Sequence, residues 1–413
     1  MSLKKSQDYQ LKFPRLKEAT RLALGLLALW LVSNNLVQAE VPLTNGNCVT
    51  QWRPAFTYDA VQYPFTHRCA QLGFGNYHYF DEQITTAPRG TVLLVHGNPT
   101  WSFLYRDIAR ELIAQNYRVI AIDHYGFGLS DKPSLTDFGY TPAEHTAVLE
   151  DFIQLLDLKD LTLVVQDWGG PIGLGAAGHL PERVKNLLVM STWAWPIDAV
   201  EPGNYFSMRD WSVWNQLNQD YVINTAFTPR ETGKMLAVIY GGSGSPIYET
   251  IRNAYWSPFI NPKTRLPLNP TVATPTSIFA RSIVEATAFM TETEQNLSLL
   301  TDKPIYLLYG HQDRWLGALK PNPNAALPCP EGTQETVVEG VSYCTRSDTG
   351  DFIYPYLENF LARWPAEKVV GSRVSMTADH FIQEYEPAAI VNAINELNAV
   401  RVETSPPPLM TVY

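Results

Sequence analysis

The sequence is poor in positive charge. It has 31 Lys and Arg residues against 41 Asp and Glu residues, which gives a formal net charge of −10 over 413 residues. Proteins that bind nucleic acid or anionic lipid usually present a basic surface, because the phosphates they contact are negative. The charge balance therefore argues against nucleic acid as a partner and favours a neutral small molecule.

A long apolar run near the start of the sequence is also lacking. The run at residues 22–32 (LALGLLALWLV) is too short to span a membrane comfortably. Basic residues precede it and the small-residue sequence Val37-Gln38-Ala39 follows it, which is typical of a secretory signal. We expect a signal peptide at residues 1–39, a periplasmic or secreted protein and no membrane association after cleavage. An uncleaved membrane anchor is the alternative.

Cysteine is scarce, and none of the four cysteines forms a C-x-x-C pair. The sequence therefore gives no reason to expect a metal or another cofactor. An even number of cysteines in an exported chain predicts disulfides. Three pairings are possible, and proximity in sequence favours Cys48 with Cys69 and Cys329 with Cys344. No internal repeat of 20 to 50 residues is visible, which excludes repeat architectures.

Short apolar runs alternate with helical patterns along much of the chain. Such runs are typical of strands buried on both faces of a parallel sheet, and the intervening helices predict an α/β fold with helices on both faces. The strand candidates are residues 91–96, 119–123, 161–166, 187–190 and 304–310, and the helix candidates are residues 102–114, 142–156 and 171–177.

The alternation stops after Met190, and an aromatic-rich stretch intervenes before the run at 304–310. A helical cap inserted into the sheet order explains this interruption and would exclude water from a site. The expected segments are the signal peptide (1–39), the first part of the core (40–192), the cap (193–301) and the second part of the core (302–413), the last with a cysteine-containing insertion (316–350).

The stretch LTLVVQDWGGPIG, residues 161–173, reads as a strand, a tight glycine turn and a helix. Such a turn is the nucleophile elbow of many hydrolases, where a serine is usual, and here it carries Asp167. Val165 stands where the serine version has glycine, so the motif is half matched. The alternative is that Asp167 simply caps the following helix.

The sequence HGNPTW, residues 96–101, follows an earlier strand, where elbow hydrolases place an oxyanion loop. The backbone N–H groups of Asn98 and Trp168 are expected to face one point and to stabilise negative charge there. We expect His96 to be structural rather than a base.

A histidine base and an acid should follow the elbow in the chain. The segment GHQDRW after the run at 304–310 supplies Asp313, and TADHFIQEYEP supplies His380. His311 is the rival base.

Taken together, HGNPTWSFLYR, DHYGFGLSDKP, VVQDWGGPIG, GHQDRW and DHFIQE resemble the haloalkane dehalogenase family of α/β-hydrolases, over roughly residues 74–398. The resemblance implies an α/β-hydrolase fold in which Asp167 attacks carbon and displaces halide. Trp168 and Asn98 would bind the halide, and His380 would activate the water that hydrolyses the resulting ester. The products would be an alcohol, a halide ion and a proton, from a halogenated substrate and water.

The family places its acid after one of two strands, and the sequence STWAWP after Met190 holds no carboxylate. Asp313 is therefore the expected acid. Two departures from the family stand out: the insertion at 316–350, which we expect on the surface, and Asp379 beside the base, which could compete with Asp313. An oligomeric state is not indicated.

Two other functions remain open. An epoxide hydrolase uses the same aspartate, histidine and acid together with two cap tyrosines, and Asn98 favours the dehalogenase because epoxide hydrolases usually have an aromatic residue there. A non-catalytic small-ligand-binding module of the same fold is the third possibility, since fold alone does not settle chemistry.

Overall fold

The computed structural model describes residues 61–197, 245–259, 274–321 and 329–399. The expected signal peptide at 1–39, Cys48 and much of the expected cap lie outside the described residues. In the described ranges, no helix has the length and apolar character needed to cross a membrane.

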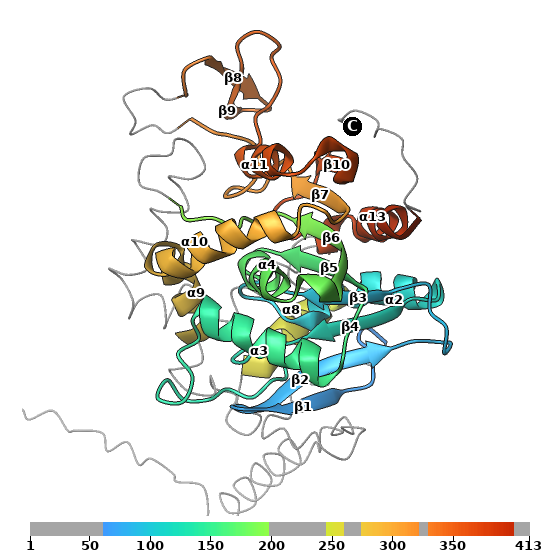
Figure 1. Cartoon of the computed structure of the whole chain (residues 1–413). Coiled ribbons are helices and arrows are strands. Elements are labelled where there is room, and N and C mark those ends of the chain that lie inside the picture. The colour runs from blue at the N-terminus through green and yellow to red at the C-terminus, as the bar shows by residue number, and fades with distance from the viewer. Residues whose placement is uncertain (1–60, 198–244, 260–273, 322–328, 400–413) are drawn as a thin grey trace, which may run out of the picture. The chain divides into compact units, whose positions relative to one another are not determined.

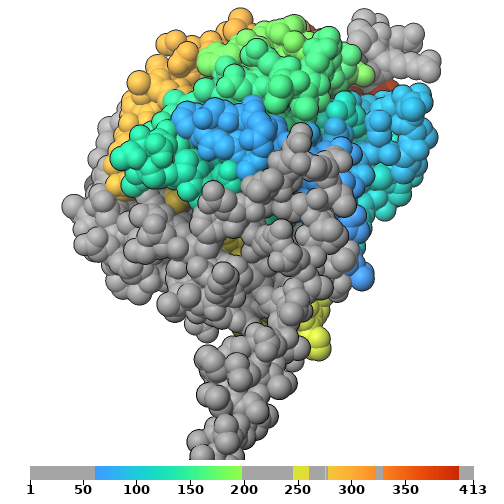
Figure 2. Space-filling view, turned by 90° about the horizontal axis from the view of Figure 1, so that it is seen from below, coloured from blue at the N-terminus to red at the C-terminus, as the bar shows by residue number. Residues whose placement is uncertain are grey.

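An eight-stranded sheet forms the centre of the described structure, in the order β1-β2-β4-β3-β5-β6-β7-β10. The strands from β4 to β10 pair in parallel, and β1 and β2 add an antiparallel edge that the sequence analysis did not identify. The bounds are β1 Arg68–Leu72, β2 Gly75–Glu82, β3 Thr91–Val95, β4 Arg118–Ile122, β5 Leu161–Gln166, β6 Val184–Met190, β7 Ile305–Gly310 and β10 Val369–Ser375. Figure 2 shows the first described residues, in blue, exposed on one face of the molecule.

Helices cover both faces of this sheet (Figure 1), so the predicted α/β-hydrolase fold class is confirmed. Helices α3, α4 and α10 pack together on one side, and α2 and α13 pack together on the other. The bounds are α2 Arg106–Ala114, α3 Pro142–Leu155, α4 Gly169–His179, α10 Thr287–Asn296, α11 Pro355–Arg363, α12 Ile382–Tyr385 and α13 Pro387–Ala399.

Local sequence explains the elements that lead to the site. All six residues of β5 are buried, as expected for an apolar strand between helical layers. Helix α3 begins with a complete capping box, in which the Thr141 side chain accepts from the Glu144 N–H and the Glu144 side chain accepts from the Thr141 N–H. The strand and the helix were both predicted from the sequence, whereas the capping box was not.

Between β6 and β7, the described parts of the expected cap are helical beyond residue 245, whereas residues 193–197 are not. The α-helices are α8 Pro246–Trp256, α9 Thr274–Glu285 and α10. The exact borders proposed from the sequence, 193 and 301, remain predictions.

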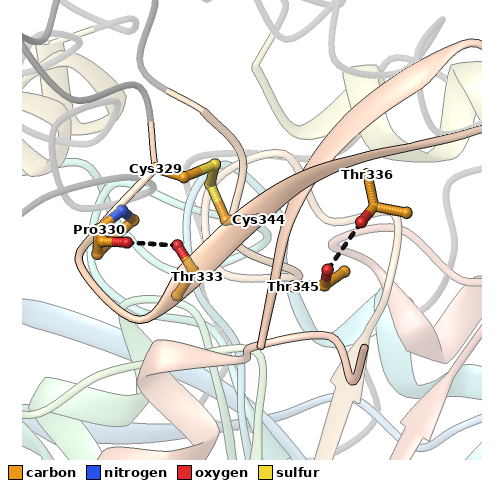
Figure 3. Close-up of a disulfide and its surroundings, with 6 residues drawn as sticks. All are labelled: Cys329, Pro330, Thr333, Thr336, Cys344 and Thr345. Atoms are coloured by element: carbon orange, nitrogen blue, oxygen red, sulfur yellow. Dashed lines mark hydrogen bonds between the residues drawn. A yellow bond between two sulfur atoms is a disulfide. The ribbon is translucent and has the colours of Figure 1, made fainter. Parts of the chain in front are cut away.

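A separate antiparallel hairpin, β8 Thr333–Val338 and β9 Val341–Arg346, lies next to α11 and away from the central sheet (Figure 1). The predicted Cys329–Cys344 disulfide is present at its base (Figure 3). Cys69 is also disulfide-bonded, and its expected partner Cys48 lies outside the described residues. These two strands were not predicted from the sequence.

The insertion is only partly a surface feature. Strand β8 is largely exposed, whereas the middle of β9 is buried. The Tyr343 ring lies 4.9 Å from the His311 ring, and the Cys344 N–H donates to the Leu319 carbonyl at 2.8 Å. The hairpin therefore braces the loop that begins at the end of β7 and carries Asp313.

Candidate active site

Asp167 lies on the turn between β5 and α4 with a φ of +53°. This left-handed conformation is unfavourable for a residue with a side chain, and such residues concentrate at functional sites. The loop after β6 holds the turn, because the Asp167 N–H donates to the Ser191 carbonyl at 3.1 Å and the Thr192 hydroxyl donates to the Asp167 carbonyl at 2.6 Å.

The alternative in which Asp167 caps the helix is wrong. Trp168 is the N-cap residue of α4, and its side chain makes no capping hydrogen bond. The Asp167 carboxylate is turned toward the loops opposite instead, where it contacts Asn98 and His380.

Two glycines permit this close arrangement of the elbow. A Cβ on Gly97 would overlap the Asp167 carboxylate, and a Cβ on Gly169 would overlap the Val95 carbonyl. The loop after β3 and the start of α4 can therefore approach each other only with glycine at these positions.

The two oxygens of the Asp167 carboxylate have different partners. Oδ1 accepts from the Asn98 backbone N–H at 2.5 Å, and Oδ2 lies 3.2 Å from Nε2 of His380. The predicted meeting of the HGNPTW loop with the elbow is therefore observed for Asn98. One oxygen is fixed by a backbone donor while the other faces the histidine.

His380 connects Asp167 to Asp313. Its Nδ1 lies 2.8 Å from Asp313 Oδ2, and Oδ1 of Asp313 accepts from the N–H groups of Trp315 and Leu316 at 2.9 and 3.1 Å. The Asp313 side chain is fully buried, and the His380 side chain is 7% exposed. The structure thus brings all three residues expected from the sequence into one hydrogen-bonded line.

The charges along this line depend on one another. Burial would lower the pKa of His380, but the negative charges and hydrogen bonds of Asp313 and Asp167 outweigh it and hold that pKa well above its usual value. Burial would raise the pKa of Asp313, yet His380 and the two backbone donors keep it below its usual value. Both shifts favour a protonated His380 beside an ionised Asp313.

Trp168 and Asn98, the two expected halide ligands, flank Asp167. The Trp168 ring is stacked on Phe279 of α9, with centroids 5.3 Å apart, and meets Trp193 edge to face at 4.9 Å. Trp168 is 2% exposed, so its indole is held among apolar rings where few acceptors compete for its N–H.

The rival histidines have other partners. His311 Nδ1 lies 2.8 Å from the Tyr354 hydroxyl, and its ring packs against aromatic residues of the insertion. His96 Nδ1 faces the Gly97 carbonyl at 2.9 Å, and its Nε2 accepts from the His124 N–H at 3.0 Å. Both are structural, as expected for His96.

Asp379 does not compete with Asp313 for the histidine ring. Its carboxylate accepts from the Phe381 N–H at 3.1 Å and from the Tyr385 hydroxyl at 3.2 Å, so it supports the start of α12. Within the described ranges, no group of three or more His, Cys, Asp or Glu side chains is arranged to hold a metal ion.

A buried network that was not predicted from the sequence involves Glu384, shortly after the histidine. Both Nη atoms of Arg106 pair with the two carboxylate oxygens of Glu384 at 2.6 and 2.8 Å, and the Tyr255 hydroxyl of α8 also donates to Glu384. A single polar residue gives no periodic signal, and only the fold shows that these three side chains meet. The network ties the histidine segment to the core and to α8.

Glu384→Gln is expected to lower the free energy of unfolding by about 3–5 kcal/mol, because the Arg106 guanidinium would stay buried without this carboxylate. Urea unfolding followed by tryptophan fluorescence measures the change. The matched control is Glu358→Gln, whose partner Arg346 is 46% exposed and whose loss should cost less than about 1 kcal/mol. Equal effects of the two substitutions would contradict a buried ion pair.

The family model described as alpha/beta hydrolase fold matches residues 90–339. Haloalkane dehalogenase 2 of Mycobacterium tuberculosis is 44% identical over 145 residues, which cover 35% of this chain and 48% of that protein. A cis-3-alkyl-4-alkyloxetan-2-one decarboxylase of Shewanella oneidensis is 34% identical over 199 residues, 48% of this chain and 58% of that protein. The chain spans about half the length of the curated relatives it matches.

Solved structures agree on the fold. The tetrameric haloalkane dehalogenase DpaA of Paraglaciecola agarilytica has a TM-score of 0.55 with 21% sequence identity, over 84% of this chain and 95% of that one. The resemblance to haloalkane dehalogenases expected from the sequence is confirmed by relatives with that name.

Proposed function

The chain belongs to the α/β hydrolase fold family, and from this premise we propose that it is a haloalkane dehalogenase that cleaves carbon–halogen bonds by hydrolysis. One observation carries the proposal: the elbow presents a carboxylate, Asp167, that is hydrogen-bonded to a histidine, which is in turn paired with a buried acid. The similarity to named dehalogenases supports the same conclusion.

A carboxylate at the elbow suits displacement at an alkyl carbon, because it is already ionised at neutral pH and needs no base to activate it. Oδ1 of Asp167 is held by the Asn98 N–H, so Oδ2 is the proposed attacking atom. As the new C–O bond forms, the carbon–halogen bond breaks and its electron pair leaves with the halide. The indole N–H of Trp168 and the side-chain N–H of Asn98 are the proposed donors to that halide.

Hydrolysis of the ester completes the proposed cycle. His380 takes a proton from water, the water oxygen attacks Cγ of Asp167, and the Asn98 N–H stabilises the negative charge that develops on Oδ1. The proton then passes to the departing alkoxide, giving the alcohol and restoring the carboxyl group. Over the cycle, one water is consumed and one halide ion and one proton are released.

The charge arrangement explains the order of the two steps. Before alkylation, the two carboxylates raise the pKa of His380 and so favour its protonated form. Esterification removes the negative charge of Asp167, and with it part of what holds the proton on the imidazole. His380 thus becomes a base only after there is an ester to hydrolyse.

Halide release by the purified protein tests the proposal, with a panel of bromo- and chloroalkanes as substrates and styrene oxide as a comparison. Release of bromide together with the alcohol is the expected result. Opening of the epoxide alone would overturn the assignment in favour of an epoxide hydrolase, and binding of haloalkanes without any turnover would favour a binding module.

Trp168→Phe is expected to lower kcat/KM for bromoalkanes by about 10²-fold, because it removes one donor to the leaving halide while keeping a ring to stack on Phe279. Steady-state bromide release measures the loss. Trp195→Phe is the matched control, because Trp195 packs against Tyr356 and Phe360 of α11. A similar loss in both variants would contradict a halide-binding role for Trp168.

A second candidate function is decarboxylation of a β-lactone, and the Shewanella relative favours it because its match is longer than that of the dehalogenase. Asp167 would attack C4 of an oxetan-2-one and break the C4–O bond, so that the ring oxygen leaves as a carboxylate. Loss of CO₂ would then form the C3–C4 double bond and expel Asp167. This route consumes no water, so CO₂ release without halide release would identify it.

A further inference from the structure

Gln166 is the last residue of β5, and its side chain lies within hydrogen-bond distance of the proposed base, His380. Its Nε2 lies 3.1 Å from the His380 carbonyl oxygen and 3.1 Å from Nε2 of the His380 ring. The residue is fully buried, and its Oε1 has no hydrogen-bond partner among the described residues. Both of these side-chain contacts of Gln166 are therefore made by its amide nitrogen, and both are with His380.

The contact with the backbone fixes which way the amide points. A carbonyl oxygen only accepts, so the nitrogen of the Gln166 amide, and not its oxygen, must face His380. An amide nitrogen carries two hydrogens. While one is donated to the carbonyl, the second is available to Nε2 of the ring.

Nε2 of His380 consequently lies between two groups that favour opposite protonation states of the ring. When it carries a proton, it donates to Asp167 Oδ2 at 3.2 Å; when it does not, it accepts from Gln166 at 3.1 Å. A carboxylate favours the protonated ring, and an N–H donor favours the neutral ring.

The remaining neighbours of the ring do not change this balance between the two half-reactions. Asp313 stays paired with Nδ1 throughout, and Asp379 is bonded to the Phe381 N–H and the Tyr385 hydroxyl. The Trp315 and Phe381 rings that pack on His380 carry no charge. Among these groups, only Asp167 changes charge when the ester forms.

We propose that Gln166 is a positioning residue for ester hydrolysis: it holds the His380 backbone and offers an N–H donor that favours the neutral imidazole once Asp167 has become an ester. The inference rests on the proposed dehalogenase function. It also assigns a purpose to a polar side chain in an otherwise apolar strand end.

NMR titration of the His380 imidazole tests the proposal without any turnover. Asp167→Asn supplies an uncharged stand-in for the ester, and Gln166→Met is added to it. The expected result is a rise of the His380 pKa by roughly one pH unit on removal of the donor. An unchanged or lower pKa would overturn the proposal. Gln166→Leu gives the same reading if Gln166→Met does not fold.

Thr162→Val is the matched control for this titration. Thr162 is also a buried polar residue of β5, but its hydroxyl is bonded with Asn186 and Asn398 at the opposite end of the strand. It should leave the His380 pKa unchanged, and an equal shift in this variant would assign the effect to strand disruption and overturn the proposal.

Single-turnover kinetics supply the second readout. With 1-bromobutane, Gln166→Met should release the first bromide within about threefold of the wild-type rate, while the pH profile of ester hydrolysis moves upward by roughly one unit. A loss confined to bromide release would overturn the proposal. If the wild-type protein releases no halide at all, the proposed function fails, whereas the titration still decides the role of Gln166.

Discussion

Asp167→Asn is expected to abolish halide release, lowering kcat by at least about 10⁴-fold for every haloalkane that the protein accepts. An amide oxygen is a far weaker nucleophile than a carboxylate, and no neighbouring group can replace it, because the elbow aims this one side chain at His380. Bromide detection over hours, with circular dichroism to verify the fold, measures the effect.

Asp313→Asn is the informative companion to that variant. Asp313 is also a buried carboxylate bonded to His380, but it lies on the far side of the ring from Asp167. We expect it to permit one round of bromide release and to slow hydrolysis. Residual steady-state turnover in Asp167→Asn at the level of Asp313→Asn would contradict a nucleophilic role for Asp167.

His380→Phe is expected to stop the reaction halfway. The carboxylate can still displace halide, but no base remains to activate water, so each protein molecule should release one halide and keep the alkyl group as an ester. Steady-state turnover should fall by about 10³-fold or more. Intact-mass spectrometry would show an increase equal to one alkyl group, and peptide mapping would place it on Asp167.

The double variant Asp167→Asn/His380→Phe is the control and should gain no mass. An adduct in the double variant would show that another residue is alkylated. Absence of an adduct in His380→Phe, while the wild-type protein is active, would contradict the covalent mechanism. For the alternative lactone reaction the outcome differs, because expulsion of Asp167 by loss of CO₂ needs no base, and His380→Phe should keep most of that activity.

Much of the fold and of this site was predictable because the signals are local. Strand β5 is a continuous apolar run, the predicted helix α3 begins at a capping box of Thr141 and Glu144, and Asp167, Asp313 and His380 each follow a strand at the sheet edge where such residues converge. In each of these cases, a few residues that are close together in the sequence determine the structure that forms.

The features that were missed depend on long-range contacts. Strand β1 is the edge strand and β2 lies beside it, and neither contains a continuous apolar run. The Gln166 side chain contacts His380, which is 214 positions later in the sequence. Arg106 and Glu384 are separated by 278 positions. No periodicity marks such pairs, because the fold alone brings them together.

The disulfide at the base of the β8–β9 hairpin also determines what a cut in the chain would do. Cys329 and Cys344 close a loop of 15 positions that contains the exposed turn at Glu339 and Gly340. A protease that nicks this turn would open the chain without dividing the molecule, since both fragments would stay linked through sulfur. The product would run as one band on a non-reducing gel and as two bands on a reducing gel. The exposed hairpin turn is also a suitable place to insert a peptide tag.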